Sequence, residues 1–166
     1  MKFHWRSSPV LRLILATLVV SGVVLFIFHI KGGSTEGSRI LEIRDSASGK
    51  VYGRWPLEGT GEFAIEFIHS VHQSPVRETF KAKGKMIQLV SVRFYSFGAG
   101  MQSDLGEGQV LSRDGDAMII TGYTASFKEL NYIVGTVSDH LMFINNEEFS
   151  LRELCGRNAH ITFRLR

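Results

Sequence analysis

Two different hydrophobic patterns divide the chain. Residues 10–30 read VLRLILATLVVSGVVLFIFHI, an apolar run in which Arg12 is the only formal charge. At about 1.5 Å per residue, a helix of this length would span roughly 31 Å, which is close to the hydrocarbon thickness of a bilayer. The pattern therefore predicts one N-terminal transmembrane helix at residues 10–30.

Beyond residue 38, the pattern changes to short runs of β-type residues separated by turn residues. These runs lie at 40–45, 50–55, 86–97, 116–123, 130–137, 140–144, 147–151 and 159–166. Only LRELCG, at 151–156, favours a helical turn. Such spacing is typical of an all-β protein, so residues 39–166 are predicted to form an antiparallel β-sandwich or β-barrel of about 8–10 short strands.

One predicted hairpin, EFAIEFIHSVHQSPVRETF, contains the first candidate site. A turn centred on residues 73–74 would pair Glu66 with Lys81 on a wet face and His69 with Glu78 on the apolar face. An unpaired buried charge costs several kcal/mol, so an imidazole and a carboxylate that both point inward are expected to have a structural or a functional role. The pair is interpreted either as a satisfied core pair that fixes the register or as a polar spot lining a ligand cavity.

A second candidate is the stretch SFGAGM at residues 96–101. Gly98 and Gly100, followed by Met101, can hold positive φ and leave backbone N–H groups free to bind an anion. A tight turn or a bulge explains the same glycines.

Catalytic chemistry finds little support in the sequence. His69 and Ser70 are neighbours, so a strand would point them to opposite faces and they cannot form a nucleophile–base pair. A catalytic triad would need Asp139, His140 or His160 to be brought in by the fold, and no nucleophile-elbow pattern is present. The sequence therefore predicts that the protein is not an enzyme.

Metal chemistry is equally weakly indicated. Residues of suitable ligand type lack local ligand spacing or match no known calcium loop; they are His69, Glu78, His140, His160 and the acidic residues Asp104, Glu107, Asp114 and Asp116. A solvated acidic loop is favoured for the last four. The prediction is that the protein has no metal and no cofactor.

Charge adds a prediction about topology. The net charge is +3, and the whole excess comes from Lys2, Arg6 and Arg12, because the rest of the chain is formally neutral. A basic N-terminus on a neutral body argues against a nucleic-acid partner. The positive-inside rule places residues 1–9 in the cytoplasm.

The predicted organisation is then an inner-membrane protein with a single span and its C-terminal domain in the periplasm. Residues 31–38, KGGSTEGS, form a flexible tether between the two parts. A cleaved signal peptide is the alternative for the apolar run, but cutting after Val20-Ser21-Gly22 would leave VVLFIFHI at the new N-terminus.

The combination of HSV at 69–71, Pro75, Glu78 and GAGM at 98–101 resembles a bacterial family of unknown function, the one numbered eighteen-fifty. The resemblance runs from about Ile40 to the C-terminus. It implies a small, often membrane-anchored protein that is encoded beside TRAP transporters of the TAXI type, with no established catalytic residues. The implied partners are a TRAP permease or its solute-binding protein. The alternative to such an accessory domain is an independent small-ligand or metal-binding β domain, or a minor hydrolase.

Overall fold

A computed structural model describes residues 39–98 and 104–166, which form twelve strands and one short helix. The elements are β1 (Ile40–Asp45), β2 (Val51–Pro56), β3 (Glu62–Ile68), β4 (Pro75–Lys83), β5 (Met86–Phe94), β6 (Val110–Asp114), β7 (Ala117–Thr121), β8 (Ser126–Phe127), β9 (Glu129–Ile133), β10 (His140–Ile144), β11 (Glu147–Ser150), α2 (Leu151–Cys155) and β12 (His160–Leu165). The all-β prediction is confirmed. The strand number was underestimated because β6 and the two-residue β8 lie in stretches that lack a clear β pattern.

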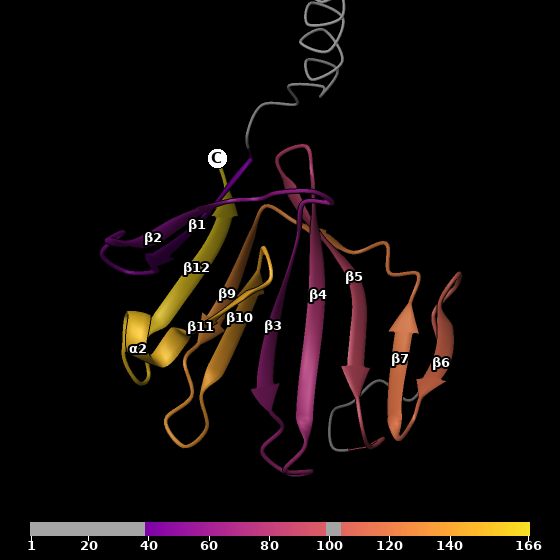
Figure 1. The fold of residues 1–166 in the computed structure, drawn as a ribbon. Helices are drawn as coiled ribbons and strands as arrows, with labels where there is room; N and C mark the ends of the chain where they lie inside the picture. The colour runs from indigo at the N-terminus through magenta and orange to yellow at the C-terminus, as the bar shows by residue number, and fades with distance from the viewer. Residues whose placement is uncertain (1–38, 99–103) are drawn as a thin grey trace, which may run out of the picture. The chain divides into compact units, whose positions relative to one another are not determined.

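The strands form two antiparallel sheets (Figure 1). Sheet A has the order β2-β1-β12-β9, and sheet B has the order β11-β10-β3-β4-β5-β7-β6, with β8 paired to β5. Strands β1 and β2 come from the start of the described chain and β12 from its end. Sheet A is therefore complete only when β12 pairs with β1.

The main core lies between the two sheets, which makes the fold a sandwich. Sheet A contributes Leu41, Ile43, Ile161 and Phe163, and sheet B contributes Phe63, Ile65, Met142 and Ile144. The rings of Phe63 and Phe163 stack across the interface with 6.1 Å between centroids. A smaller cluster of Val76, Phe94, Met118 and Ile120 lies on strands β4, β5 and β7 of sheet B.

Local signals in the sequence explain two of the connections. Asn145 and Asn146 join β10 to β11 with φ values of 52° and 64°, the left-handed conformation that a two-residue hairpin turn requires. Helix α2 begins after Ser150, whose hydroxyl accepts a hydrogen bond from the Glu153 N–H at 3.0 Å. The predicted helical turn at 151–156 is therefore confirmed.

The β3–β4 hairpin forms, but the predicted register is wrong. Glu66 pairs with Arg77, and Lys81 pairs with Glu62, so the predicted Glu66–Lys81 pair is absent. The observed register brings together two pairs of opposite charge, with N···O distances of 2.8 Å for Arg77–Glu66 and 3.7 Å for Lys81–Glu62. Because the shift is an even number of residues, the apolar residues keep the predicted inward face.

The membrane predictions concern residues outside the described ranges. Within residues 39–98 and 104–166, no helix has the length and apolar character needed to cross a bilayer. The predicted segments 1–9, 10–30 and 31–38 all lie outside these ranges.

Candidate functional site

His69 lies in the loop that joins β3 to β4, and not opposite Glu78 as predicted. Its Nδ1 atom accepts hydrogen bonds from the backbone N–H groups of Val71 and His72, at 3.3 and 3.2 Å. The loop closes through the His69 N–H, which donates to the Ser74 carbonyl at 2.9 Å. A side chain that bonds the backbone two and three residues ahead stabilises a turn, so His69 ends the strand instead of extending it.

This loop meets the second predicted motif. The His72 Nε2 atom lies 3.1 Å from the Gly98 carbonyl oxygen, and the His69 and His72 rings stack with 4.9 Å between centroids. Gly98 has φ 90°, a backbone conformation that glycine adopts freely. Gly100 and Met101 lie outside the described residues. The β3–β4 loop and Gly98 therefore lie together at one end of sheet B.

The same end of sheet B exposes large apolar side chains, which together are called the loop-end surface. They are Ile68, Val71, Tyr95 and Phe97, with exposed fractions of 37%, 65%, 38% and 42%. Ile68 and Tyr95 are connected through Pro75, which pairs with Ile68 and lines one cleft with Tyr95. Phe97 packs edge-on against Phe94, with 5.3 Å between ring centroids. Exposed apolar residues that adjoin one another, as Ile68 and Tyr95 do through Pro75, are typical of an interaction site, whereas scattered ones are ordinary.

Glu78 does point into the sandwich, and its partner comes from the other sheet. The Tyr132 hydroxyl, on β9 of sheet A, donates a hydrogen bond to the Glu78 Oε2 atom on β4 of sheet B. Burial raises the pKa of Glu78 from its ordinary value of 4.5, and the Tyr132 hydrogen bond only partly offsets that rise. Burial and the nearby Glu78 carboxylate also raise the pKa of Tyr132.

His140 extends this polar group within the apolar interior. Its ring stacks on Phe67 at 5.4 Å and contacts the Tyr132 ring edge at 6.2 Å, while its Nδ1 atom accepts the Gly135 N–H at 3.1 Å. Burial lowers the pKa of His140 below 6.5, which favours the neutral imidazole. Sequence reasoning missed Tyr132 and His140 as neighbours of Glu78, since they are joined to it by contacts between the two sheets.

A cleft of about 250 Å³ opens beside the Glu78–Tyr132 pair. Its lining comes from both sheets and consists of Glu78, Phe80, Leu89, Phe127, Leu130, Asn131 and Tyr132. A mostly apolar cleft with a few converging polar groups is the usual form of a small-ligand site. A carboxyl group with a raised pKa could donate or accept a hydrogen bond there.

The candidate catalytic residues have other tasks. Asp139 accepts hydrogen bonds from the Ser150 hydroxyl at 2.5 Å and from the Arg152 N–H at 3.1 Å, so it caps helix α2. His140 is bonded through Nδ1 to a backbone N–H, and His160 is exposed on β12. This geometry leaves Asp139 occupied with the start of the helix.

The acidic residues chosen as possible metal ligands are exposed on loops and the β6 edge. Asp114 forms an ion pair with Arg93 at 2.8 Å. Within the described part of the chain, no group of three or more His, Cys, Asp or Glu side chains is arranged to hold a metal ion.

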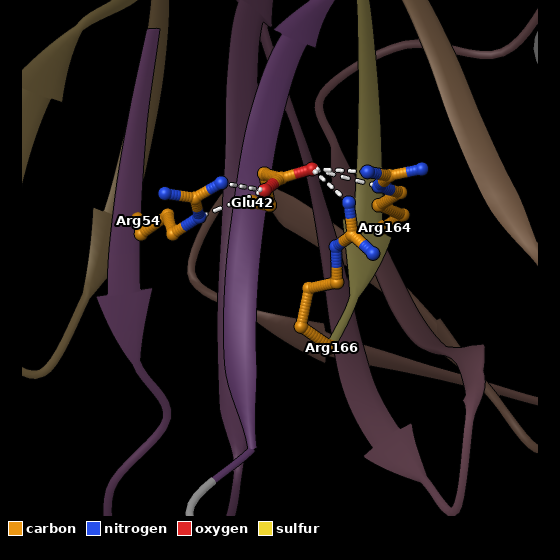
Figure 2. Close-up of polar contacts among 4 residues, drawn as sticks. All are labelled: Glu42, Arg54, Arg164 and Arg166. Atoms are coloured by element: carbon orange, nitrogen blue, oxygen red, sulfur yellow. Dashed lines mark hydrogen bonds and ion pairs between the residues drawn. The ribbon is translucent and has the colours of Figure 1, made fainter. Parts of the chain in front are cut away.

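Sequence reasoning missed a further charged cluster, which lies on strands β1, β2 and β12 of sheet A and on Arg166 after β12 (Figure 2). Glu42, on β1, is completely covered and forms ion pairs with Arg54 at 2.7 Å, Arg164 at 2.6 Å and Arg166 at 3.4 Å. Loss of hydration, the largest effect, would raise the pKa of Glu42, but hydrogen bonds and charges from Arg54 and Arg164 outweigh it and lower the pKa. Cross-strand pairing explains the cluster, since Glu42 lies opposite Arg54 on one side and Arg164 on the other.

Comparison with protein families found a match to "Domain of unknown function (DUF1850)" over residues 63–151. The matched stretch contains β4 to β11 and nearly all of β3, and therefore almost the whole of sheet B together with β9. Strands β1, β2 and β12 lie outside it, so the match is shorter than the resemblance predicted from Ile40 onward. Comparison with curated proteins and with solved structures found no match.

Proposed function

This chain belongs to the DUF1850 family, and we propose that it is a membrane-tethered accessory domain that supports a TAXI-type TRAP transporter. It acts by binding a partner protein outside the cytoplasm, and not by catalysis. The transporter association follows from the family resemblance, and the membrane anchor follows from the apolar residues 10–30. A single span is too little membrane to form a transport path, since secondary transporters place their sites among several helices.

The loop-end surface is the observation that carries the binding role. Val71 and Phe97 expose 65% and 42% of their surfaces although both are large and apolar. The loop beneath them is held by the His69 and His72 contacts, so the surface is ordered before a partner arrives. An ordered apolar surface loses little entropy on association and fits the apolar centre of a protein–protein interface.

The polar groups of the interior support a binding role as well. Tyr132 and Glu78 bond to each other, and the most plausible general base, His140, is bonded to the Gly135 N–H. Asp139 stabilises the start of helix α2. Each of these polar groups therefore forms a hydrogen bond that stabilises the fold.

The test is to change the loop-end surface without disturbing the fold. The variant Val71→Glu adds a charge where a partner would desolvate the surface, so it should lower co-purification of TRAP components from native membranes at least ten-fold. Val110→Glu is the matched control, because Val110 is 59% exposed and lies on edge strand β6, away from the β3–β4 loop. Solute uptake should fall with Val71→Glu and stay at the wild-type level with Val110→Glu.

Transporter abundance must be held equal across these strains, and deletion of the gene sets the lower limit of uptake. Unchanged uptake in the deletion strain, together with no co-purifying transporter component, would reject the accessory role. Equal effects of Val71→Glu and Val110→Glu would reject the loop-end surface as the contact.

The cleft beside Glu78 and Tyr132 favours a second candidate, an independent domain that binds a small ligand. Its volume of about 250 Å³ suits a ligand of only a few heavy atoms. Native mass spectrometry of the purified chain distinguishes the two roles, because a retained small molecule that disappears in Leu89→Trp would support ligand binding.

A further inference from the structure

The described chain begins and ends at the same end of the domain. Ile40 and Arg166 exchange backbone hydrogen bonds of 3.3 and 2.9 Å, and the Arg39 guanidinium donates to the Ala82 carbonyl at 2.9 Å. In Figure 1 the start of β1, the turn between β4 and β5 and the C-terminus all lie at the top of the view. Arg39, the first of the described residues, therefore lies at this end of the domain.

A cleft of about 420 Å³ lies at this end, between the start of β5 and the end of β12. Met86 and Leu165 give it an apolar lining, and Lys85, Lys128, Glu129 and Arg164 surround them. Within the described residues, neither lysine forms an ion pair. The cleft thus combines an apolar lining with a rim of three cationic side chains and one carboxylate, which has a net positive charge.

The Glu42 cluster adds positive charge next to this cleft, because Arg164 belongs to both (Figure 2). One carboxylate is shared by three guanidinium groups, so positive charge remains in excess. The side chains of Arg54 and Arg166 are 56% and 52% exposed, which leaves N–H donors directed to solvent. Glu42 holds the arginines in place and neutralises only part of their charge.

We propose that the basic end, defined as Arg54, Lys85, Lys128, Arg164 and Arg166, rests on the anionic phospholipid headgroups of the membrane that anchors the chain. This inference rests on the proposed anchor. Basic residues close to a bilayer are attracted to anionic lipid over about one Debye length, roughly 8–10 Å at physiological salt. The eight residues of the tether reach at most about 28 Å, so the domain stays near the surface.

Two features favour a lipid surface over a free anion. The cationic groups come from β2, the β4–β5 turn, the β8–β9 connection and β12, so they are spread over one end and do not converge on a single point. The cleft also offers Met86 and Leu165, which match the acyl–glycerol region beneath a headgroup and not an inorganic ion.

The experiment uses the full chain in nanodiscs of phosphatidylcholine, with or without about 30% phosphatidylglycerol, and measures hydrogen exchange by mass spectrometry. Peptides covering the β4–β5 turn and the end of β12 should exchange several-fold more slowly when phosphatidylglycerol is present. About 0.5 M NaCl should remove the difference, because salt screens exposed charges. Each lysine is expected to contribute about five-fold to the ratio of lipid-bound to free domain, so Lys85→Gln/Lys128→Gln should lose most of the protection.

Arg113→Gln/Arg157→Gln is the control, since it removes the same charge at exposed sites on β6 and in the loop before β12. It should keep the wild-type protection. Equal exchange in both lipids, or equal loss in the two double variants, would overturn the proposal.

Flotation with pure phosphatidylcholine vesicles tests the anchor separately. If the chain floats with pure phosphatidylcholine vesicles but its hydrogen exchange does not differ between the two kinds of nanodisc, the anchor is retained and the lipid contact is refuted. A chain that floats only with phosphatidylglycerol, and loses this with the lysine double variant, supports the lipid contact and refutes the anchor.

Discussion

At the scale of single residues, the Glu78–Tyr132 hydrogen bond joins the two sheets inside the sandwich. Removing one partner of such a bond leaves the other desolvated and unsatisfied, which costs about 1–3 kcal/mol. Tyr132→Phe keeps the ring contacts with His140 and Phe163, so it isolates the hydroxyl. We expect its free energy of unfolding in urea at pH 7 to fall by about 1–3 kcal/mol; no change would show that water satisfies Glu78 equally well.

Glu78 also makes stability depend on pH in a direction that its pKa fixes. The pKa is raised above 4.5 in the folded state, so the native state holds more protons than the unfolded chain between 4.5 and the raised value. In that window, the contribution of Glu78 to the free energy of unfolding falls as the pH rises. Glu78→Gln cannot ionise and still accepts the Tyr132 hydrogen bond, so its stability relative to the wild type should increase as the pH rises from 4.5 toward neutrality.

His140 contributes with the opposite sign, because its lowered pKa disfavours protonation of the native state below pH 6.5. The free energies of unfolding of the wild type and of Glu78→Gln are measured in urea at a series of pH values. The contribution of His140 is common to both proteins and cancels in their difference. A difference that does not vary with pH would mean that Glu78 has an ordinary pKa in the folded protein.

At the scale of secondary structure, the family match leaves out three of the four strands of sheet A, namely β1, β2 and β12. The apolar inner face of sheet B, which includes Phe63 and Ile65, is covered by Leu41, Ile43 and Phe163 of sheet A. A fragment limited to residues 63–151 would expose that face to water and should not fold cooperatively. Residues 39–166 should show one sigmoidal urea transition, and a similar transition from the fragment would contradict this view of the core.

The hairpin shows how far a local pattern can predict a fold. Alternation of apolar and polar residues in β3 and β4 correctly predicted which side chains face inward, because that depends only on the period of two. The register depended on the turn, and His69 accepts backbone N–H groups in a wider loop than the predicted turn. The pairing of Glu66 with Arg77 was equally compatible with the charges, so the pattern alone could not choose.

The candidate site was less predictable than the hairpin. Glu78 was recognised because a carboxylate in an apolar face is unusual, but Tyr132 lies far along the chain and on the other sheet. The Glu42 cluster depends on β12 returning to pair with β1, an association between chain ends that no local pattern contains. Contacts within a hairpin are encoded locally, whereas contacts between sheets depend on the completed topology.

At the scale of the whole molecule, the β4–β5 turn, which carries Lys85 of the basic end, and the β3–β4 loop of the loop-end surface lie at opposite ends of sheet B (Figure 1). Strand β4 has nine residues and connects them, which corresponds to about 30 Å at 3.3 Å per residue. If the basic end rests on lipid, the loop-end surface is held about this far from the headgroups. A partner that contacts the loop-end surface at this distance from the headgroups would be a solute-binding protein docked outside the membrane, in preference to the permease within it.

Both proposals require the domain to lie outside the cytoplasm, which a reporter can decide. Lys2, Arg6 and Arg12 should retain the N-terminus inside, so alkaline phosphatase fused after Arg166 should be active. Arg166 lies at the basic end, so a fusion with a short linker leaves the loop-end surface free. The same enzyme fused after Pro9 should be inactive, because that junction precedes the apolar run.

An N-terminal epitope tag separates an uncleaved anchor from a cleaved signal peptide within the same strains. Retention of the tag on the membrane-bound chain is expected, because cleavage after Gly22 would leave an apolar VVLFIFHI terminus that still resists release into water. A tag-free, soluble periplasmic product would show that the apolar run only exports the domain, and the lipid contact would then lack the tether that keeps it at the surface. Fluorescence from a cytoplasmic reporter after Arg166 would reverse the orientation, and with it both the proposed partner and the proposed lipid face.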